Sequence, residues 1–122
     1  MIAGTVDSSL VAWTRLTLSG PSGQQDVDAR VDTGFNGFLS VPLGVLLALG
    51  LAPAGSSQIS LADGSTVFLP TYYVTIDWDG RQRTVQADGT SDLCLVGMSL
   101  MEGHDLSIRI RVGGALTIQA IP

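Results

Sequence analysis

Hydrophobic and polar residues alternate with a period of two along most of the chain, which is the pattern of half-buried β-strands. Two shorter apolar runs fit short strands, and the second of them, 93–96, fits a strand buried on both faces. Asp-Gly pairs at 63–64 and 79–80, with Gly-Gly at 113–114, mark tight turns between alternating runs. The pattern predicts an all-β fold with strands or hairpins at 10–18, 25–31, 38–41, 59–67, 72–78, 81–87, 93–96, 106–112 and from 116 onward.

Two short helices are expected among these strands. Pro42 stands where a first helical residue would, and Gly50 stands where a helix would end. Because the residues between them are almost all apolar, we expect a largely buried helix of about two turns. Further on, Ser99-x-x-Glu102 has the form of a capping box, and Gly103 would end that second helix almost at once.

The tripeptide Asp32-Thr33-Gly34 follows the strand 25–31 without a break. Its glycine allows a sharp turn and a close approach by a ligand or another backbone. The acid is therefore expected at the end of a packed strand and on a tight loop, which suits a carboxylate that must be both fixed and accessible. The same tripeptide also suits a plain turn, so the order of the surrounding elements has to decide between the two.

That order resembles the retropepsin-like aspartic proteases, nearest to the prokaryotic single-domain type. Asp32-Thr33-Gly34 is followed by a short strand, a hairpin at 59–67, a further hairpin, and Leu95-Val96-Gly97 before a short helix and the terminal strands. The resemblance covers nearly the whole chain. It implies a closed six-stranded acid-protease-like barrel with one or two short helices, built as a single lobe from residues 1–122.

The resemblance also implies an aspartic endopeptidase that works as a homodimer, because each chain has only one Asp-Thr-Gly. Asp32 from two subunits would activate one water, Thr33 would hydrogen-bond across the interface, and the Gly34 carbonyl would position substrate or water. The terminal strands near Met1 and at 115–122 are candidates for the interface. A flap would cover an extended peptide or unfolded protein substrate, and it would consist of Leu61, Ala62, Asp63, Gly64 and Ser65.

Two residues depart from the family pattern. Phe35 follows the tripeptide where the family usually has a small residue, so a serine hydroxyl beside the carboxylate is missing. Met98 follows Gly97 where retroviral members have an arginine that braces the dimer. Phe35 favours an alternative function, a catalytically weak or inactive module that dimerises or binds peptides. A third interpretation is a β-barrel whose Asp-Thr-Gly is only a turn.

Composition and charge exclude several other classes. The 122 residues are 45% hydrophobic and 14% charged, with a formal charge of −5, which argues against a nucleic-acid surface. One cysteine and one histidine leave no set of ligands for a multi-cysteine or histidine metal site, so we expect no metal and no cofactor. The N-terminus shows no signal-peptide pattern, and the longest apolar stretch is about half a membrane span. We therefore expect a soluble cytoplasmic protein.

The remaining reactive side chains are expected to be structural. Cys94, inside an apolar run, should be a buried and inert thiol. His104 and Asp105 follow the second helix and could form a surface pair, and the aromatic residues should pack the sheets. Six other acids compete with Asp32, but all are expected on solvent faces or in turns: Asp26, Asp28, Asp77, Asp79, Asp88 and Asp92.

Overall fold

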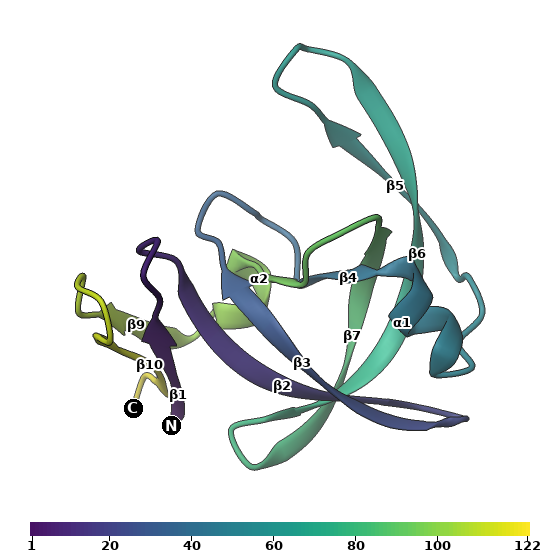
Figure 1. The fold of residues 1–122 in the computed structure, drawn as a ribbon. Coiled ribbons are helices and arrows are strands. Elements are labelled where there is room, and N and C mark those ends of the chain that lie inside the picture. Colours follow the sequence, from purple (N-terminus) through teal and green to yellow (C-terminus); the bar gives the residue numbers. More distant parts are fainter.

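Ten strands and two short helices form from these segments, as a computed structural model describes them for residues 1–122 (Figure 1). The elements are β1 (Ile2–Val6), β2 (Ala12–Gly20), β3 (Gly23–Val31), β4 (Leu39–Pro42), α1 (Leu43–Ala48), β5 (Gly55–Ser60), β6 (Thr66–Trp78), β7 (Arg81–Thr90), β8 (Leu95–Val96), α2 (Met98–Met101), β9 (His104–Ile108) and β10 (Ala115–Ala120). The predicted all-β fold with two short helices is confirmed.

Six of the strands close into a barrel. The strands follow one another in the order β5-β6-β7-β4-β8-β3-β2-β1-β10-β9, and β6 also pairs with β2. This additional pairing, Leu18 with Ile76 and Ser19 with Thr75, joins the two ends of the series β6-β7-β4-β8-β3-β2. The closed six-stranded barrel predicted from the sequence is therefore confirmed. Strand β5 extends it on one side and β1, β10 and β9 extend it on the other (Figure 1).

The barrel is filled by the inward-facing half of each alternating strand. Nineteen buried hydrophobic residues form one cluster, to which β2 contributes Leu16 and Leu18 and β6 contributes Val74 and Ile76. Removing this apolar surface from water is the main favourable term in folding. Cys94 belongs to the same cluster, as predicted, and burial raises the pKa of its thiol to about 12.

Both helices differ from their predicted form. The sequence predicts a largely buried helix α1, but Leu46 is its only buried residue. Val45 packs against the core while partly exposed, and Leu43 and Leu47 are exposed. The predicted capping box at Ser99 is also wrong. Gly97 is the N-cap of α2, and the Ser99 hydroxyl donates instead to the backbone carbonyl of Asn36. For Ser99 a tertiary contact, which local sequence does not reveal, overrides the local preference.

Several strand boundaries also differ. Strand β2 begins at Ala12, because Leu10 lies in a turn with a positive φ of 61°. Strand β9 ends at Ile108, so the expected strand through Val112 is wrong. Strand β7 continues through Thr90, because residues 87–90 pair in parallel with β4. Neither helix is long or apolar enough to cross a membrane.

The shortest strand, β8, lies between β3 and β4. It is parallel to β3, with Val31 opposite Val96, and antiparallel to β4, with Leu39 opposite Val96. The glycine that follows is closely surrounded: a Cβ on Gly97 would lie 2.1 Å from the carbonyl oxygen of Gly37 and 2.7 Å from the ring of Phe35. Gly97 is therefore needed for its size, since its φ of −100° is open to any residue.

We expect Gly97→Ala to lower the free energy of unfolding by about 1–3 kcal/mol, because the backbone of the neighbouring loop has to move to admit a methyl group. Urea denaturation of the variant and the wild-type protein measures the difference. Gly44→Ala, in helix α1, is the matched control, because its Cβ would meet no atom within 4 Å. A Gly97→Ala protein as stable as the wild type would contradict the close packing described here.

Candidate active site

Asp32 is held at the point where β3 ends. Its backbone N–H donates to the carbonyl of Val96 at 3.0 Å, which continues the pairing of β3 with β8. One carboxylate oxygen, Oδ1, accepts the backbone N–H of Gly34 at 2.9 Å, and the Asp32 carbonyl accepts the N–H of Phe35 at 3.2 Å. The carboxylate is only half-buried, while Thr33 and Gly34 are exposed. Asp32 is thus both fixed and accessible, as the sequence predicts.

The residues after Gly34 are tied to the start of α2. The N–H of Met98 donates to the carbonyl of Phe35 at 2.8 Å, and the N–H of Ser99 donates to the carbonyl of Gly37 at 3.2 Å. The Phe35 ring lies against Gly37 and Gly97, two positions where a larger residue would collide with it. The loop that follows Asp32 is therefore fixed by the short helix as well as by β8.

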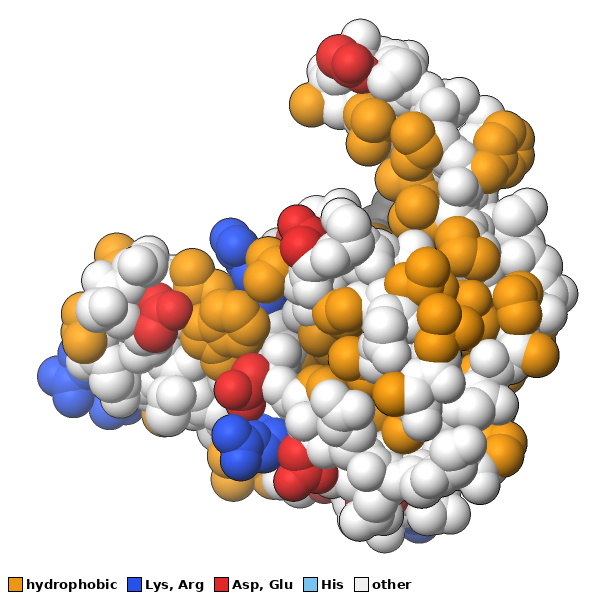
Figure 2. Space-filling view, turned by 45° about the vertical axis from the view of Figure 1, so that its right-hand side comes forward, with side chains coloured by type: hydrophobic (Ala, Val, Ile, Leu, Met, Phe, Trp, Pro, Cys, Tyr) orange, Lys and Arg blue, Asp and Glu red, His pale blue; other side chains and the backbone are white.

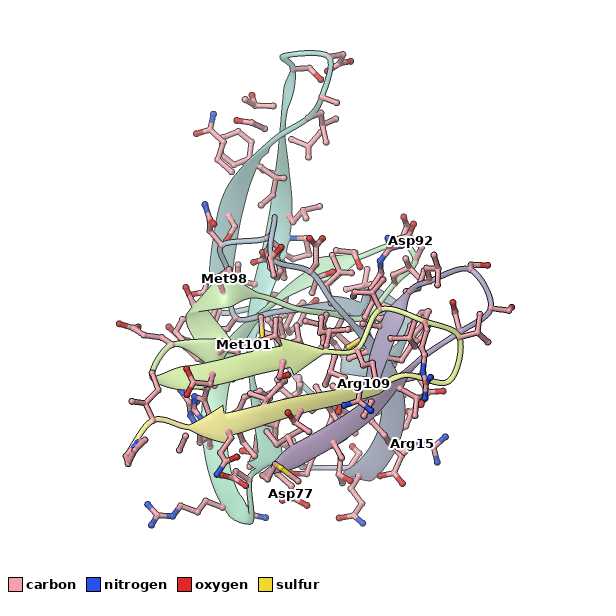
Figure 3. The ribbon with its side chains drawn as sticks, turned by 90° about the vertical axis from the view of Figure 1, so that its left-hand side faces the viewer. Arg15, Asp77, Asp92, Met98, Met101 and Arg109 are labelled. Carbon is pink, nitrogen blue, oxygen red and sulfur yellow. The ribbon has the colours of Figure 1, made fainter.

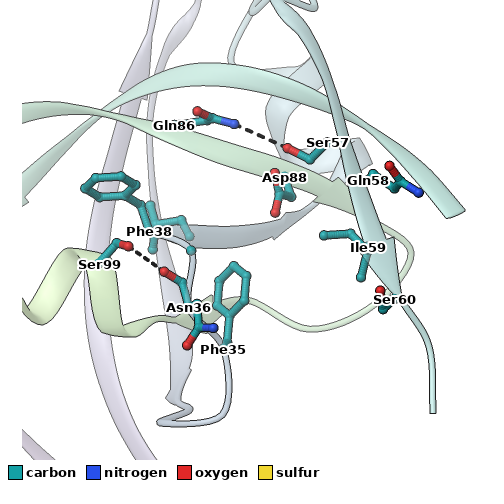
Figure 4. A pocket seen from close by; sticks show the side chains of 12 residues that line it. Phe35, Asn36, Phe38, Ser57, Gln58, Ile59, Ser60, Gln86, Asp88 and Ser99 are labelled. Carbon is teal, nitrogen blue, oxygen red and sulfur yellow. Dashed lines mark hydrogen bonds between the residues drawn. The ribbon is translucent and has the colours of Figure 1, made fainter. Parts of the chain in front are cut away.

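A hollow of about 490 Å³ opens beside this loop. Its walls are residues 35–39 of the loop and of β4, residues 57–60 of β5, two side chains of β7, and Ser99. Figure 4 shows Asp88 of β7 in the middle of these walls, between Phe35 on one side and Ser57 and Ile59 of β5 on the other. Figure 2 shows the surface hollowed between the projecting β5–β6 arm and the barrel, with hydrophobic side chains along the arm.

A second, smaller hollow of about 240 Å³ lies on the other side of the loop and includes Asp32 and Thr33 themselves. Seven of its ten lining residues are hydrophobic. Two of them, Leu10 and Ile110, are 58% and 69% exposed, and Val112, in the same turn as Ile110, is 63% exposed. The candidate acid therefore borders an apolar surface that is open to solvent.

The predicted flap residues, Leu61, Ala62, Asp63, Gly64 and Ser65, form the exposed tip of the β5–β6 hairpin. Asp63 accepts the backbone N–H of Ser65 at 2.9 Å and also its hydroxyl, and these bonds lower the pKa of the Asp63 carboxyl. The hairpin stands away from the barrel, at the end where the loop after β3 also lies (Figure 1). None of the five tip residues lines either hollow: the larger one takes residues 57–60 from the stem of the hairpin, and the smaller one takes no residue of the hairpin.

The competing acids are accounted for, with one exception. Asp77 lies at the end of the barrel opposite to the hairpin (Figure 3). The other exposed acids have partners elsewhere: Asp26 bonds to Thr17, Asp28 to Arg15, Asp79 to the N-terminal ammonium of Met1, and Asp92 to the N–H of Leu93. Asp88 was expected in a polar loop, which is wrong: it lies within β7 and is only 8% exposed. The signal that could have found it is the continued alternation of small and apolar residues through Val85, Ala87 and Gly89.

His104 takes no part in the site. The surface pair that His104 and Asp105 could have formed is absent, because His104 accepts the indole N–H of Trp78 at 3.3 Å and lies edge-on to its ring. Its other ring nitrogen lies 3.0 Å from the carbonyl of Glu102. No three His, Cys, Asp or Glu side chains come together in a way that suits a metal ion.

No family model matches the sequence, and no curated protein matches it either. Among solved structures, a retropepsin-like aspartic protease from Rickettsia conorii matches with a TM-score of 0.58 and 16% identity, over 99% of this chain and 91% of that one. A foamy viral protease-reverse transcriptase matches with a TM-score of 0.52 and 19% identity, over 71% of this chain. This chain spans 11% of the viral one. The closed barrel, the Asp32 loop crossed by β8 and these matches together assign the chain the retropepsin-like aspartic protease fold.

Proposed function

We propose that this chain is an aspartic endopeptidase that hydrolyses peptide bonds as a homodimer. The observation that carries the proposal is the position of Asp32 in the retropepsin-like fold. Its half-buried carboxylate ends a barrel strand, is oriented by the Gly34 amide, and lies on a loop fixed by β8 and α2. A carboxylate so placed has the rigidity that an acid–base catalyst needs, while its exposed neighbours leave room for a partner and a substrate.

The chemistry needs two such carboxylates on either side of one water. Two carboxylates at such a short distance cannot both ionise, so the two share one proton. The resulting pKa values belong to the pair of carboxylates and not to one aspartate. The ionised member takes a proton from the attacking water, and the protonated member donates a hydrogen bond to the carbonyl oxygen of the peptide. Thr33 and Gly34, both exposed, would face the partner subunit and the substrate.

A second copy of the chain is the natural source of the second carboxylate, because the sequence has one Asp-Thr-Gly. The apolar surface beside Asp32, with Leu10 and Ile110 exposed, supports this partner. Exposed hydrophobic residues that gather on one surface mark interaction sites. On a two-fold axis through this surface, the two Asp32 side chains would approach each other while the apolar residues leave water.

Strand β5 supports a peptide as the substrate. It is the last strand at one end of the sheet, so one of its edges has unpaired backbone groups, and residues 57–60 of the same strand line the larger hollow. An extended peptide can add to such an edge through main-chain hydrogen bonds, with side chains entering pockets. The exposed hairpin tip at 61–65 would then close over the bound chain.

Phe35 supports a second candidate function, a module that dimerises or binds peptides with little or no turnover. The carboxylate of Asp32 accepts one hydrogen bond, from Gly34, and the aromatic residue at position 35 offers no hydroxyl to it. Less stabilisation of the ionised form would weaken catalysis without weakening peptide binding. The two functions differ in whether bound peptides are cut.

Asp32→Asn is expected to lower kcat for cleavage of an unfolded protein by about 10²–10⁴-fold, because an amide can neither take a proton from water nor share one. Cleavage is measured by mass spectrometry and initial rates from mildly acidic to neutral pH, at a concentration where the protein is dimeric. Asp77→Asn, an exposed acid at the far end of the barrel, is the control and should leave the rate unchanged. Cleavage by a folded Asp32→Asn protein at the wild-type rate would refute the assignment, and binding without cleavage by the wild type would favour the module.

Ile110→Asp is expected to weaken the dimer by about a hundredfold or more, because the interface would then have to remove a charge from water at an apolar position. The monomer should keep its stability, since Ile110 is 69% exposed and lies outside the strands. Sedimentation equilibrium measures the dissociation constant, and cleavage should fall in proportion to the dimer that remains. Leu47→Asp, a similar change at an exposed residue of α1, should leave both unchanged. An Ile110→Asp protein that dimerises like the wild type would place the interface elsewhere.

A further inference from the structure

Asp88 is a buried acid for which the barrel itself provides no counter-charge. It is 8% exposed and lies in β7, opposite Ser40 of β4 and Thr71 of β6, which are both neutral. Neither ion pair of the structure, Met1 with Asp79 and Arg15 with Asp28, includes it. Burying a carboxylate without a cation is costly, and acids are rarely buried unless they are paired.

The surroundings of Asp88 are polar but neutral. Burial raises the pKa of its carboxyl, and the nearby Ser57 hydroxyl opposes that shift. The amide of Gln86 donates to the Ser57 oxygen at 3.3 Å, so Ser57 keeps its own O–H to donate toward Asp88 (Figure 4). A carboxylate accepts up to about four hydrogen bonds, so most of the acceptor capacity of Asp88 is left open.

That capacity faces the hollow of about 490 Å³ next to the Asp32 loop. Asp88 is the one ionisable residue among the twelve that line it. Phe35, Phe38 and Ile59 give the same hollow apolar walls. A long side chain with an apolar stem and a cationic end matches this arrangement, since the stem can pack on the rings while the charge reaches the acid.

We propose, building on the function proposed above, that Asp88 makes this hollow selective for a basic side chain of the bound peptide, lysine or arginine. The cation of the peptide supplies the counter-charge that the barrel does not provide for Asp88. When the cation binds, Asp88 is fully ionised. The net charge of −5 on the whole chain favours the approach of basic peptides as well. Asp88 is then a specificity-determining residue, distinct from the acid that activates water.

A purely structural role is the alternative, in which Asp88 serves only to hold Ser57 and β5 in place. It predicts that changes at position 88 alter the stability of the hairpin and not the choice of peptide. A protonated Asp88 that donates to a neutral amide is a further alternative. The proposal predicts a preference for a positively charged peptide side chain, and neither alternative predicts one.

Peptide binding is measured on the inactive Asp32→Asn protein, so that cleavage does not affect the result. The probes are fluorescently labelled apolar nonapeptides that have one arginine, moved through each position, and a matched set with citrulline, which has nearly the same shape but no charge. We expect the arginine peptides to bind at least about tenfold more tightly at one or two positions, as measured by fluorescence anisotropy. The difference should disappear in Asp32→Asn/Asp88→Asn and persist in Asp32→Asn/Asp92→Asn, whose changed acid is exposed.

Equal binding of arginine and citrulline peptides at every position would overturn the proposal, as would tighter binding of citrulline or a preference that survives Asp88→Asn. The comparison of arginine with citrulline peptides on the protein that keeps Asp88 tests the proposal even if the Asp88→Asn variant does not fold. Selective binding without cleavage by the wild type would refute the protease and leave the role of Asp88 standing. Peptides that do not bind at all would refute both.

Discussion

The insertion of β8 between β3 and β4 is the constraint on which both the barrel and the site depend. A strand of two residues closes the gap in the barrel wall, and the same backbone bonds that close it hold Asp32. The carbonyl of Cys94 accepts the N–H of Arg30 at 2.8 Å, and the carbonyl of Val96 accepts that of Asp32 at 3.0 Å. Displacing β8 would therefore open the barrel and free the acid together.

The tip of the β5–β6 hairpin, unlike the Asp32 loop, is held only by local bonds. Residues 61–68 are all exposed, and the tip is held by local bonds such as Leu61 N–H to the Ser65 carbonyl at 2.8 Å. A segment with few buried apolar contacts opens at low free-energy cost compared with the core. The molecule thus joins a rigidly held acid to an arm that costs little to move.

The parts of the fold that the sequence predicted are those set by local patterns. Alternation located the barrel strands, the turn at Asp79-Gly80 follows from its Asp-Gly pair, and both residues have the positive φ that such a turn needs. Two of the misses come from tertiary contacts. Asp88-Gly89 has the composition of a turn, yet parallel pairing with β4 extends β7 through it. The Ser99 hydroxyl could cap its own helix, but it bonds to the Asn36 carbonyl instead.

The candidate site was predictable to the same extent. The placement of Asp32 at a strand end could be predicted from the motif and the strand pattern, whereas the two hollows depend on elements far apart in the sequence. Residues 32 and 33 line the smaller hollow and residues 35–39 line the larger one, so the same loop presents an acid to one and aromatic rings to the other. Phe35 links these tasks, because its ring lines the larger hollow while its backbone is bonded to Asp32 and Met98. Its size is accommodated by Gly37 and Gly97, and a smaller residue at position 35 would leave space beside both glycines. The departure from the family pattern at position 35 is therefore coupled to the shape of the larger hollow, and not only to the hydroxyl that is missing beside Asp32.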